Sequence, residues 1–278
     1  MSRLETRFRA LRQQNRAGLV TFTMAGDPDL DGSLNLLRGL PTAGADVIEV
    51  GMPFSDPMAD GPAIQAAGRR ALKFGMTVRR TLELVAHVRA NDVHTPIVLM
   101  GYYNPIYRFG PDRFVEVARA AGVDGLIVVD LPPEEDEELR PLAAKAGIDF
   151  IRLVAPTTGE ARLERILAEV NGFIYYVAVR GITGAGSAPI AEIAEAVQRI
   201  RRKTTLPVAV GFGIRTPEQA AAVAKVADAA VVGSAIVERL AEHLTADGAS
   251  TGAVAQALAL VRGLARAVRA ARVAPVRS

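Results

Sequence analysis

The chain has no cysteine, and its only histidines are His87, His94 and His243. The absence of cysteine excludes disulfide bonds and thiolate metal sites. Three histidines so widely separated form no ligand cluster of the kind that holds a catalytic metal. We therefore expect neither metal catalysis nor a cofactor held by such side chains.

Long apolar runs and an excess of charge of one sign are also missing. No apolar run approaches the ~18 residues of a membrane span, and the N-terminus lacks the apolar core of a signal peptide. We therefore expect a cytoplasmic protein without a membrane partner. The 33 basic and 30 acidic residues give a formal charge of +3. This excess is too small to predict a nucleic-acid partner.

What the sequence does have is a regular alternation of strand-like and helix-like segments. We expect strands at residues 19–25, 46–50, 96–101, 125–130, 148–154, 173–178, 206–210 and 229–232. We expect helices at residues 2–15, 30–42, 63–73, 78–90, 112–121, 134–146, 160–169, 189–201, 217–226 and 252–271. Eight such units in 278 residues favour an α/β fold of the (β/α)₈ TIM-barrel type over an open sheet.

The ends of the chain complete this expected architecture. Residues 2–15 place Leu4, Phe8 and Leu11 at helical spacing, which predicts an additional N-terminal amphipathic helix across one end of the core. A targeting peptide is the weaker interpretation, because Glu5 is unfavourable there. We expect residues 1–278 to form one domain, with a frayed tail from about residue 272.

Two further segments have competing interpretations. The acidic run from Glu134 to Glu138 could suggest a metal site, but acids in the first turns of a helix complement its dipole, and we favour that interpretation. Tyr102-Tyr-Asn-Pro105, after the third expected strand, is interpreted as a loop.

The stretch from Asp46 to Pro62 contains the first candidate for chemistry. Glu49 is the fourth residue of an apolar strand and shares one face with Val47, where an ionised carboxylate is costly. A strand-end ion pair with an arginine would also explain it. The irregular loop that follows carries Asp56 and Asp60, for which ordinary turn chemistry is the alternative. In a barrel, these residues lie at the C-terminal ends of the strands, where active sites occur.

Glycine-rich turns follow the last three expected strands. They are Gly181-Ile-Thr-Gly184, Gly211-Phe-Gly213 and Gly233-Ser234. Glycine allows backbone N–H groups to approach an anion closely, and barrels often bind phosphate in the loops after strands 7 and 8 with a short helix N-terminus. The turns could also simply end strands. We predict that phosphate binds at Thr183, Gly184, Gly213, Gly233 and Ser234.

Apolar residues are available to line the space above the barrel. Phe22, Ile64, Met100, Ile127 and Val129 suit a flat hydrophobic substrate end, although the same residues would also fit an ordinary barrel core. Of the adjacent Tyr175 and Tyr176, only one can face into the barrel, because side chains alternate along a strand.

With these residues in place, the whole chain resembles the alpha subunits of tryptophan synthase. The motifs that carry the resemblance are Gly51-Met-Pro-Phe-Ser-Asp-Pro-Met-Ala-Asp-Gly-Pro62, Met100-Gly-Tyr-Tyr-Asn-Pro105, Asp130-Leu-Pro132, Gly181-Ile-Thr-Gly184, Gly211-Phe-Gly-Ile214 and Gly233-Ser-Ala-Ile-Val237. The resemblance implies a lyase that cleaves indole-3-glycerol phosphate to indole and glyceraldehyde 3-phosphate by a retro-aldol reaction. It also implies that no cofactor is held in this chain.

The resemblance implies roles for particular residues. Glu49 matches the family's proton shuttle, Asp60 matches the aspartate that binds the indole N–H, and Tyr175 matches an active-site tyrosine. Residues Pro53, Asp56, Pro57 and Asn104 resemble contacts to a beta subunit that holds pyridoxal phosphate, receives indole through a tunnel and completes an α₂β₂ tetramer.

Three residues near the sixth strand depart from the family pattern. Ala178 stands where serine is common, Arg180 where a small residue is common, and Gly186 where arginine often follows the motif. They bear on closure of the loop after this strand and on its coupling to a partner. Three alternative functions stay open: a regulatory or scaffolding subunit that kept the barrel, a stand-alone lyase, and another phosphosugar barrel enzyme. The intact Glu49, Asp60 and glycine turns speak against the first, and the Pro53–Pro57 loop with Asn104 speaks against a stand-alone lyase.

Overall fold

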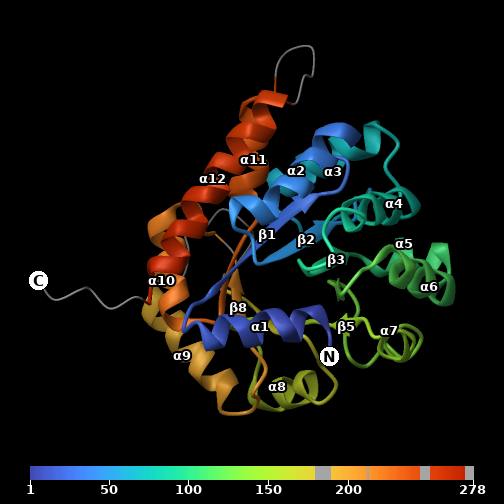
Figure 1. Cartoon of the computed structure of the whole chain (residues 1–278). Helices are drawn as coiled ribbons and strands as arrows, with labels where there is room; N and C mark the ends of the chain where they lie inside the picture. Colours follow the sequence, from blue (N-terminus) through green and yellow to red (C-terminus); the bar gives the residue numbers. More distant parts are fainter. Residues whose placement is uncertain (179–188, 212, 245–250, 273–278) are drawn as a thin grey trace, which may run out of the picture.

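The computed structural model of the chain describes residues 1–178, 189–211, 213–244 and 251–272. Figure 1 shows parallel strands surrounded by helices, with α1 lying across them at the front. The strands are β1 (Gly18–Met24), β2 (Val47–Gly51), β3 (Ile97–Gly101), β4 (Gly125–Val128), β5 (Asp149–Phe150), β6 (Arg152–Val154), β7 (Ile174–Val177), β8 (Val208–Gly211) and β9 (Ala229–Val232). The helices are α1 (Arg3–Gln13), α2 (Leu30–Ala43), α3 (Pro62–Lys73), α4 (Val78–Arg89), α5 (Tyr103–Phe109), α6 (Pro111–Ala121), α7 (Arg140–Ala146), α8 (Glu160–Leu167), α9 (Ile190–Arg201), α10 (Pro217–Val226), α11 (Ser234–Glu242) and α12 (Thr251–Ala270).

The strands form a closed barrel. The sheet has nine strands in the order β5-β4-β3-β2-β1-β9-β8-β7-β6, and all its pairings are parallel. β5 and β6 are separated only by Ile151, whose N–H donates to the carbonyl of Leu126 at 2.9 Å. They are therefore two halves of one strand, which pairs with β4 through one half and with β7 through the other. The predicted (β/α)₈ barrel is confirmed, with its fifth strand interrupted.

Two hydrophobic cores follow from the alternation of side chains along each strand. Ile48 and Val50 of β2 face outward into the larger core between the strands and the helices, whereas Val47 faces the inside of the barrel. Because helices cover the outside of the barrel and side chains fill its inside, both faces of a strand are apolar. This is why the strands are short continuous apolar runs in the sequence.

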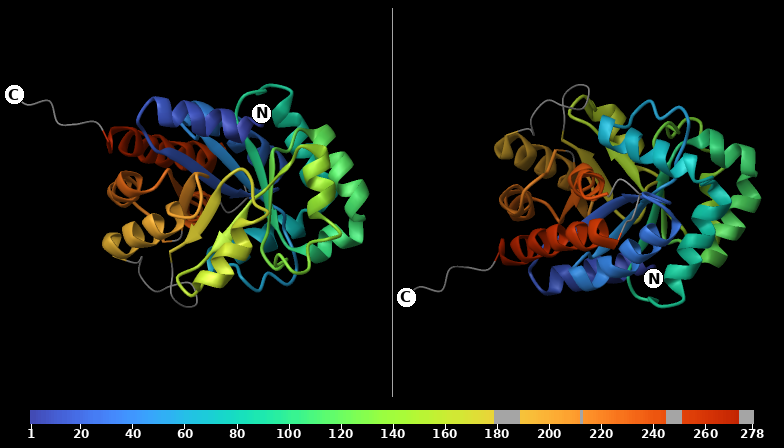
Figure 2. Two further views of the ribbon diagram at one scale, coloured as in Figure 1. Left: turned by 90° about the horizontal axis from the view of Figure 1, so that it is seen from below. Right: turned by 90° about the horizontal axis from the view of Figure 1, so that it is seen from above.

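Helix α1 closes the N-terminal end of the barrel. Leu4, Phe8 and Leu11 are buried in the inner core, and the rings of Phe8 and Phe173 lie 5.6 Å apart. The left view of Figure 2 shows α1 at one end of the barrel. The expected position of the N-terminal helix is therefore confirmed.

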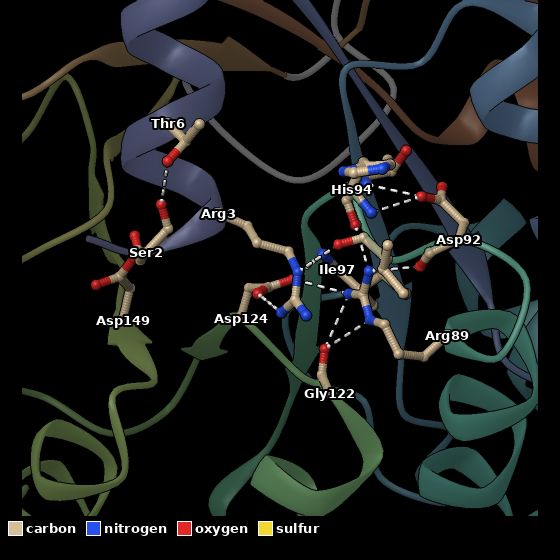
Figure 3. Close-up of polar contacts among 12 residues, drawn as sticks. Ser2, Arg3, Thr6, Arg89, Asp92, His94, Ile97, Gly122, Asp124 and Asp149 are labelled. Carbon is tan, nitrogen blue, oxygen red and sulfur yellow. Dashed lines mark hydrogen bonds and ion pairs between the residues drawn. The ribbon is translucent and has the colours of Figure 1, made fainter.

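Polar contacts hold α1 in this position, as Figure 3 shows. Asp124, which is 5 % exposed, accepts from Arg3 Nη1 at 2.8 Å and from Arg89 Nη2 at 2.9 Å. The same carboxylate accepts from the backbone N–H of Ile97 at 2.8 Å. Ser2 Oγ donates to Asp149 at 2.7 Å. Asp124 thus ties α1 and α4 to the start of β3.

The region around α5 corrects the expected loop at residues 102–105. α5 begins at Tyr103, so Pro105 lies in its first turn. Proline is tolerated there because the first N–H groups of a helix have no partner within the helix.

The predicted helix at 134–146 is wrong in its first part, because α7 begins only at Arg140. Pro141 can occupy the first turn of a helix but not the interior that the longer helix would have required. The acidic run therefore precedes the helix. Asp136 within it is 1 % exposed and forms ion pairs with Arg140 and Arg152.

Arg272, from which fraying was expected, is instead held in place. Its Nε donates to the carbonyl of Ala224 at 2.8 Å. Residues 273–278 lie outside the described residues. Within the described part of the chain, we find no helix with the length and apolar character needed to cross a membrane.

Candidate active site

Glu49 points into the barrel from the middle of β2. It lies two residues after the inward-facing Val47 and pairs in register with Phe22 of β1 and Val98 of β3. Its side chain is 1 % exposed, and Oε2 has no hydrogen-bond partner among the described residues. Burial raises the pKa of this carboxyl to about 8 from its ordinary value of 4.5. At neutral pH, the group is therefore protonated and ready to donate its proton.

Tyr175 is the aromatic residue of β7 that faces the barrel interior. It belongs to the inner core, whereas Tyr176 belongs to the outer one, as alternation requires. Burial and the nearby charge of Glu49 raise the pKa of the Tyr175 phenol well above its ordinary value. Its ring lies against Gly211, where an added Cβ would be 2.9 Å from Tyr175 Cζ. The glycine of β8 therefore leaves space for the tyrosine ring.

Asp60 lies in the loop between β2 and α3, and Tyr102 holds its carboxylate. The Tyr102 hydroxyl donates to Asp60 Oδ1 at 2.8 Å and accepts from the N–H of Ala59 at 3.0 Å. The Tyr102 ring also lies 5.5 Å from that of Phe54. Burial raises the pKa of Asp60, while the Tyr102 hydrogen bond opposes that rise. Tyr102 therefore contacts the loop at three points and orients its carboxylate.

The predicted apolar wall is only partly assembled by the structure. Met100 and Ile127 lie on the adjacent strands β3 and β4 and pair in register, whereas Phe22 lies on β1, which β2 separates from β3. Phe22 lies close to Gly51 and Gly233, where an added Cβ would be 2.6 Å and 3.1 Å from Phe22 atoms. Ile64 is half-buried in the first turn of α3 and packs against the outer core.

Part of the predicted phosphate site lies within the described residues. Gly213 is exposed and has a φ of 79°, a conformation that favours glycine. Gly233 is the N-cap residue of α11, which begins at Ser234. Glycine has no side chain to cap the first N–H groups of this helix. An anion is favoured at such a helix end. Thr183 and Gly184 lie outside the described residues, as do Arg180 and Gly186.

The predicted partner contacts differ in their exposure. Asp56 and Asn104 are exposed, Pro57 is half-buried, and Pro53 is buried. The surface of this loop is therefore provided by the residues after Pro53, including Met58, which is 78 % exposed. Asn104 lies in the first turn of α5, which follows β3 at the same end of the barrel.

Sequence reasoning missed Tyr102, which the structure brings to Asp60. Tyr102 lies within the Met100–Pro105 motif, but tyrosine after an apolar strand gives no local signal of its partner. The hydrogen bond between Tyr102 and Asp60 joins residues 42 positions apart. Only the barrel, which places the ends of β2 and β3 side by side, brings them together.

A cavity of about 630 Å³ lies at the opposite end of the barrel. It is lined by α1, by residues around β5, and by the segments that precede β7 and β8. Its charged residues include Glu5 and Arg9, which pair with each other, and Asp149, which accepts from Ser2. It is separated from Glu49 by the inner core. Among the described residues, no group of three or more His, Cys, Asp or Glu side chains could hold a metal ion.

Fold and site together define a (β/α)₈-barrel enzyme with a buried carboxyl group in the interior of its barrel. The sequence model of the tryptophan synthase alpha chain family matches residues 8–269. The chain belongs to the tryptophan synthase alpha chain family, which confirms the resemblance found in its motifs.

Solved structures show the same relationship. Tryptophan synthase subunit alpha from Legionella pneumophila is 37 % identical over 96 % of this chain and 98 % of that chain, with a TM-score of 0.88. A structure from Aquifex aeolicus is 36 % identical over 96 % and 99 % of the two chains, with a TM-score of 0.87. An aminoacrylate-bound form of tryptophan synthase from Mycobacterium tuberculosis matches at 35 % identity over 96 % and 100 %, with a TM-score of 0.85.

Proposed function

We propose that this barrel cleaves indole-3-glycerol phosphate to indole and glyceraldehyde 3-phosphate, with Glu49 as the acid and base of the reaction. Membership of the tryptophan synthase alpha chain family supports this carbon–carbon lyase activity. The observation that carries the role of Glu49 is a carboxyl group 1 % exposed in the barrel interior, with one oxygen unpaired and a pKa of about 8.

The reaction needs a proton at one carbon and the loss of a proton from one hydroxyl. Glu49, protonated at neutral pH, donates its proton to C3 of the indole ring. The bond between C3 and the side chain then breaks as the adjacent hydroxyl loses its proton and becomes the aldehyde carbonyl. The Glu49 carboxylate accepts that proton, so the group ends in its starting state. A pKa close to the working pH suits a group that both donates and accepts.

Asp60 is assigned to the indole N–H. Protonation at C3 places positive charge on the indole nitrogen, and a carboxylate held beside that N–H stabilises the charge as it develops. Tyr102, which donates to Asp60 Oδ1 at 2.8 Å, orients the carboxylate before substrate arrives. Phe22, Met100 and Ile127 supply the apolar surroundings of the ring, and Tyr175 lies beside Glu49.

The substrate phosphate is assigned to the loops after β8 and β9. Gly213, Gly233 and Ser234 offer backbone N–H groups, and the dipole of α11 favours the anion. We assign Thr183 and Gly184 to the same phosphate on the basis of their motif alone.

A beta subunit is the expected partner, since the Mycobacterium tuberculosis relative is a tryptophan synthase with a bound aminoacrylate. We propose that this subunit contacts Asp56, Pro57 and Asn104, together with Pro53 at the start of the same loop. We also propose that the beta subunit holds the pyridoxal phosphate and that the assembly is α₂β₂. No cofactor is assigned to this chain. Its cytoplasmic location stays a prediction.

Release of indole from indole-3-glycerol phosphate, measured with and without a beta subunit, tests the proposal. Glu49→Gln keeps the shape but loses the transferable proton, so single-turnover cleavage should fall by about 10²- to 10⁴-fold. Asp60→Asn should reduce cleavage less. The control is Glu116→Gln, a change at an exposed acid of α6, which should be as active as the wild type. Near wild-type cleavage by Glu49→Gln together with an inactive Asp60→Asn would assign the acid–base role to Asp60 instead.

A further inference from the structure

Tyr103 joins the segments that follow β3 and β4. Its backbone N–H donates to Asp130 Oδ1 at 2.8 Å, and its phenol donates to Glu138 Oε2 at 2.9 Å. Asp130 lies just after β4, and Glu138 lies just before α7. Both ends of the connection between β4 and α7 are therefore bound to one residue at the start of α5.

This connection is itself fixed to the barrel by Arg152 of β6. Arg152 donates to the carbonyl of Leu131 at 2.8 Å and forms an ion pair with Asp136. The two charged residues are 5 % and 1 % exposed, and Arg152 also lies over the ring of Phe150 at 4.5 Å. Separating this pair would leave the buried Arg152 without its carboxylate partner, which is unfavourable, although Asp136 would keep its ion pair with Arg140. Tyr103 is thus attached to a rigid segment of the protein.

The bond between Tyr103 and Asp130 also determines the direction of Tyr102. α5 begins at Tyr103, and Tyr102, at the N-cap position, makes no side-chain cap hydrogen bond. Asp130 supplies that cap from another loop, with its negative charge at the positive end of the helix. The N–H that it binds belongs to the planar peptide unit between Tyr102 and Tyr103. Fixing this unit fixes the backbone from which the Tyr102 ring extends toward Asp60.

We propose that Tyr103 is a positioning residue for Asp60, which it acts on through Tyr102. The inference rests on the proposed function of the site, in which Asp60 accepts from the indole N–H. Asp130 and Glu138 are exposed, so the two bonds of Tyr103 are in contact with solvent, and the phenol bond contributes modestly. Burial, together with Glu138, raises the pKa of the Tyr103 phenol to about 12. The phenol therefore stays protonated and can donate its hydrogen bond at all working pH values.

The test compares two unreactive ligands that differ only at the indole nitrogen. One is a propyl phosphate that carries an indole ring through C3, and the other carries benzothiophene, which has sulfur in place of N–H. Dissociation constants for both are measured on the full chain of the wild type, Tyr103→Phe, Tyr102→Phe and the double variant. Tyr107→Phe is the matched control, since Tyr107 is also in α5, is 59 % exposed and has no hydroxyl hydrogen bond among the described residues.

Tyr103→Phe removes the phenol bond to Glu138 and keeps the backbone bond to Asp130, so we expect indole-ligand binding to weaken only about two- to fivefold, as for loss of one solvent-exposed hydrogen bond. Binding of the benzothiophene ligand should stay unchanged. Tyr102→Phe should weaken indole-ligand binding by about tenfold or more, because its lost hydrogen bond is to a charged group. Adding Tyr103→Phe to Tyr102→Phe should have no further effect, since the path to Asp60 is already broken. Tyr107→Phe should bind both ligands as the wild type does.

Equal weakening of both ligands in Tyr103→Phe would show a general structural role and overturn the proposal. An unchanged preference for indole in that variant, or a further loss in the double variant, would overturn it as well. A wild type without any preference for indole would instead overturn the role of Asp60 itself, and the role of Tyr103 with it. Selective loss of indole-ligand binding that disappears on the Tyr102→Phe background would establish it.

Discussion

The burial of Glu49 predicts that this residue destabilises the fold in which it works. An acid whose pKa is raised on folding is protonated in the native state at a pH at which the unfolded chain has already ionised. Glu49→Gln removes the ionisation in both states while keeping nearly the same shape. The variant should therefore lose activity and gain stability near neutral pH.

The sign and size of the effect follow from the two pKa values. Below pH 4.5, Glu49 is protonated in both states and the effect vanishes; between 4.5 and about 8, ionisation of the unfolded chain increasingly favours unfolding. At 1.36 kcal/mol per pH unit, the penalty reaches about 3 kcal/mol at pH 7 and about 5 kcal/mol above pH 8. Burying the glutamine amide adds a cost of its own, but that cost does not depend on pH.

The measurement is the free energy of unfolding of both proteins in urea, followed by far-ultraviolet circular dichroism from pH 5 to pH 8. The stability of Glu49→Gln relative to the wild type should rise by several kcal/mol across this interval. Glu116→Gln, at an exposed position of α6, should show no such trend. A constant difference between Glu49→Gln and the wild type at all pH values would refute the buried, protonated state of Glu49.

Three further changes test other parts of the site. Gly211→Ala should displace the Tyr175 ring and reduce kcat/KM about tenfold, equivalent to ~1.4 kcal/mol; unchanged kinetics would show that the ring position is unimportant. Gly213→Leu should raise the KM for phosphorylated substrate at least about tenfold, because φ is 79° and the amide must approach the anion closely; an unchanged KM would remove Gly213 from the phosphate site. Pro57→Gly should weaken activation by the beta subunit more than basal cleavage, whereas equal losses in a titration with that subunit would limit the loop to a role in the site.

The strands and Glu49 could be predicted from the sequence because their signal is local. Alternation along β2 separates Val47 and Glu49 from Ile48 and Val50 without reference to any other part of the chain. The same local evidence misled at α5 and α7. The sequence predicts a loop at Pro105 and a helix interior at Pro141, whereas each proline occupies the first turn of its helix.

What the sequence could not reveal depends on pairs of residues that lie far apart along the chain. Asp136 is the residue of the acidic run that is buried in an ion pair with Arg152. Nothing within residues 134–138 indicates which acid will be buried. The contact between Tyr102 and Asp60 likewise exists only because β2 and β3 are neighbours in the closed barrel. Local patterns could place Glu49 and Asp60, but not Tyr102, which donates a hydrogen bond to Asp60.

The position of α1 closes one end of the barrel. Leu4, Phe8 and Leu11 fill the N-terminal end, so under the proposed function a small apolar product formed beside Glu49 cannot leave through the packed interior. Under the proposed function, substrate entry, product exit and proton exchange with solvent then take place at the C-terminal end of the strands. Asp56, Pro57 and Asn104 lie in the segments that follow β2 and β3 at that end. A subunit bound there would control all three processes and would receive each indole molecule as it left.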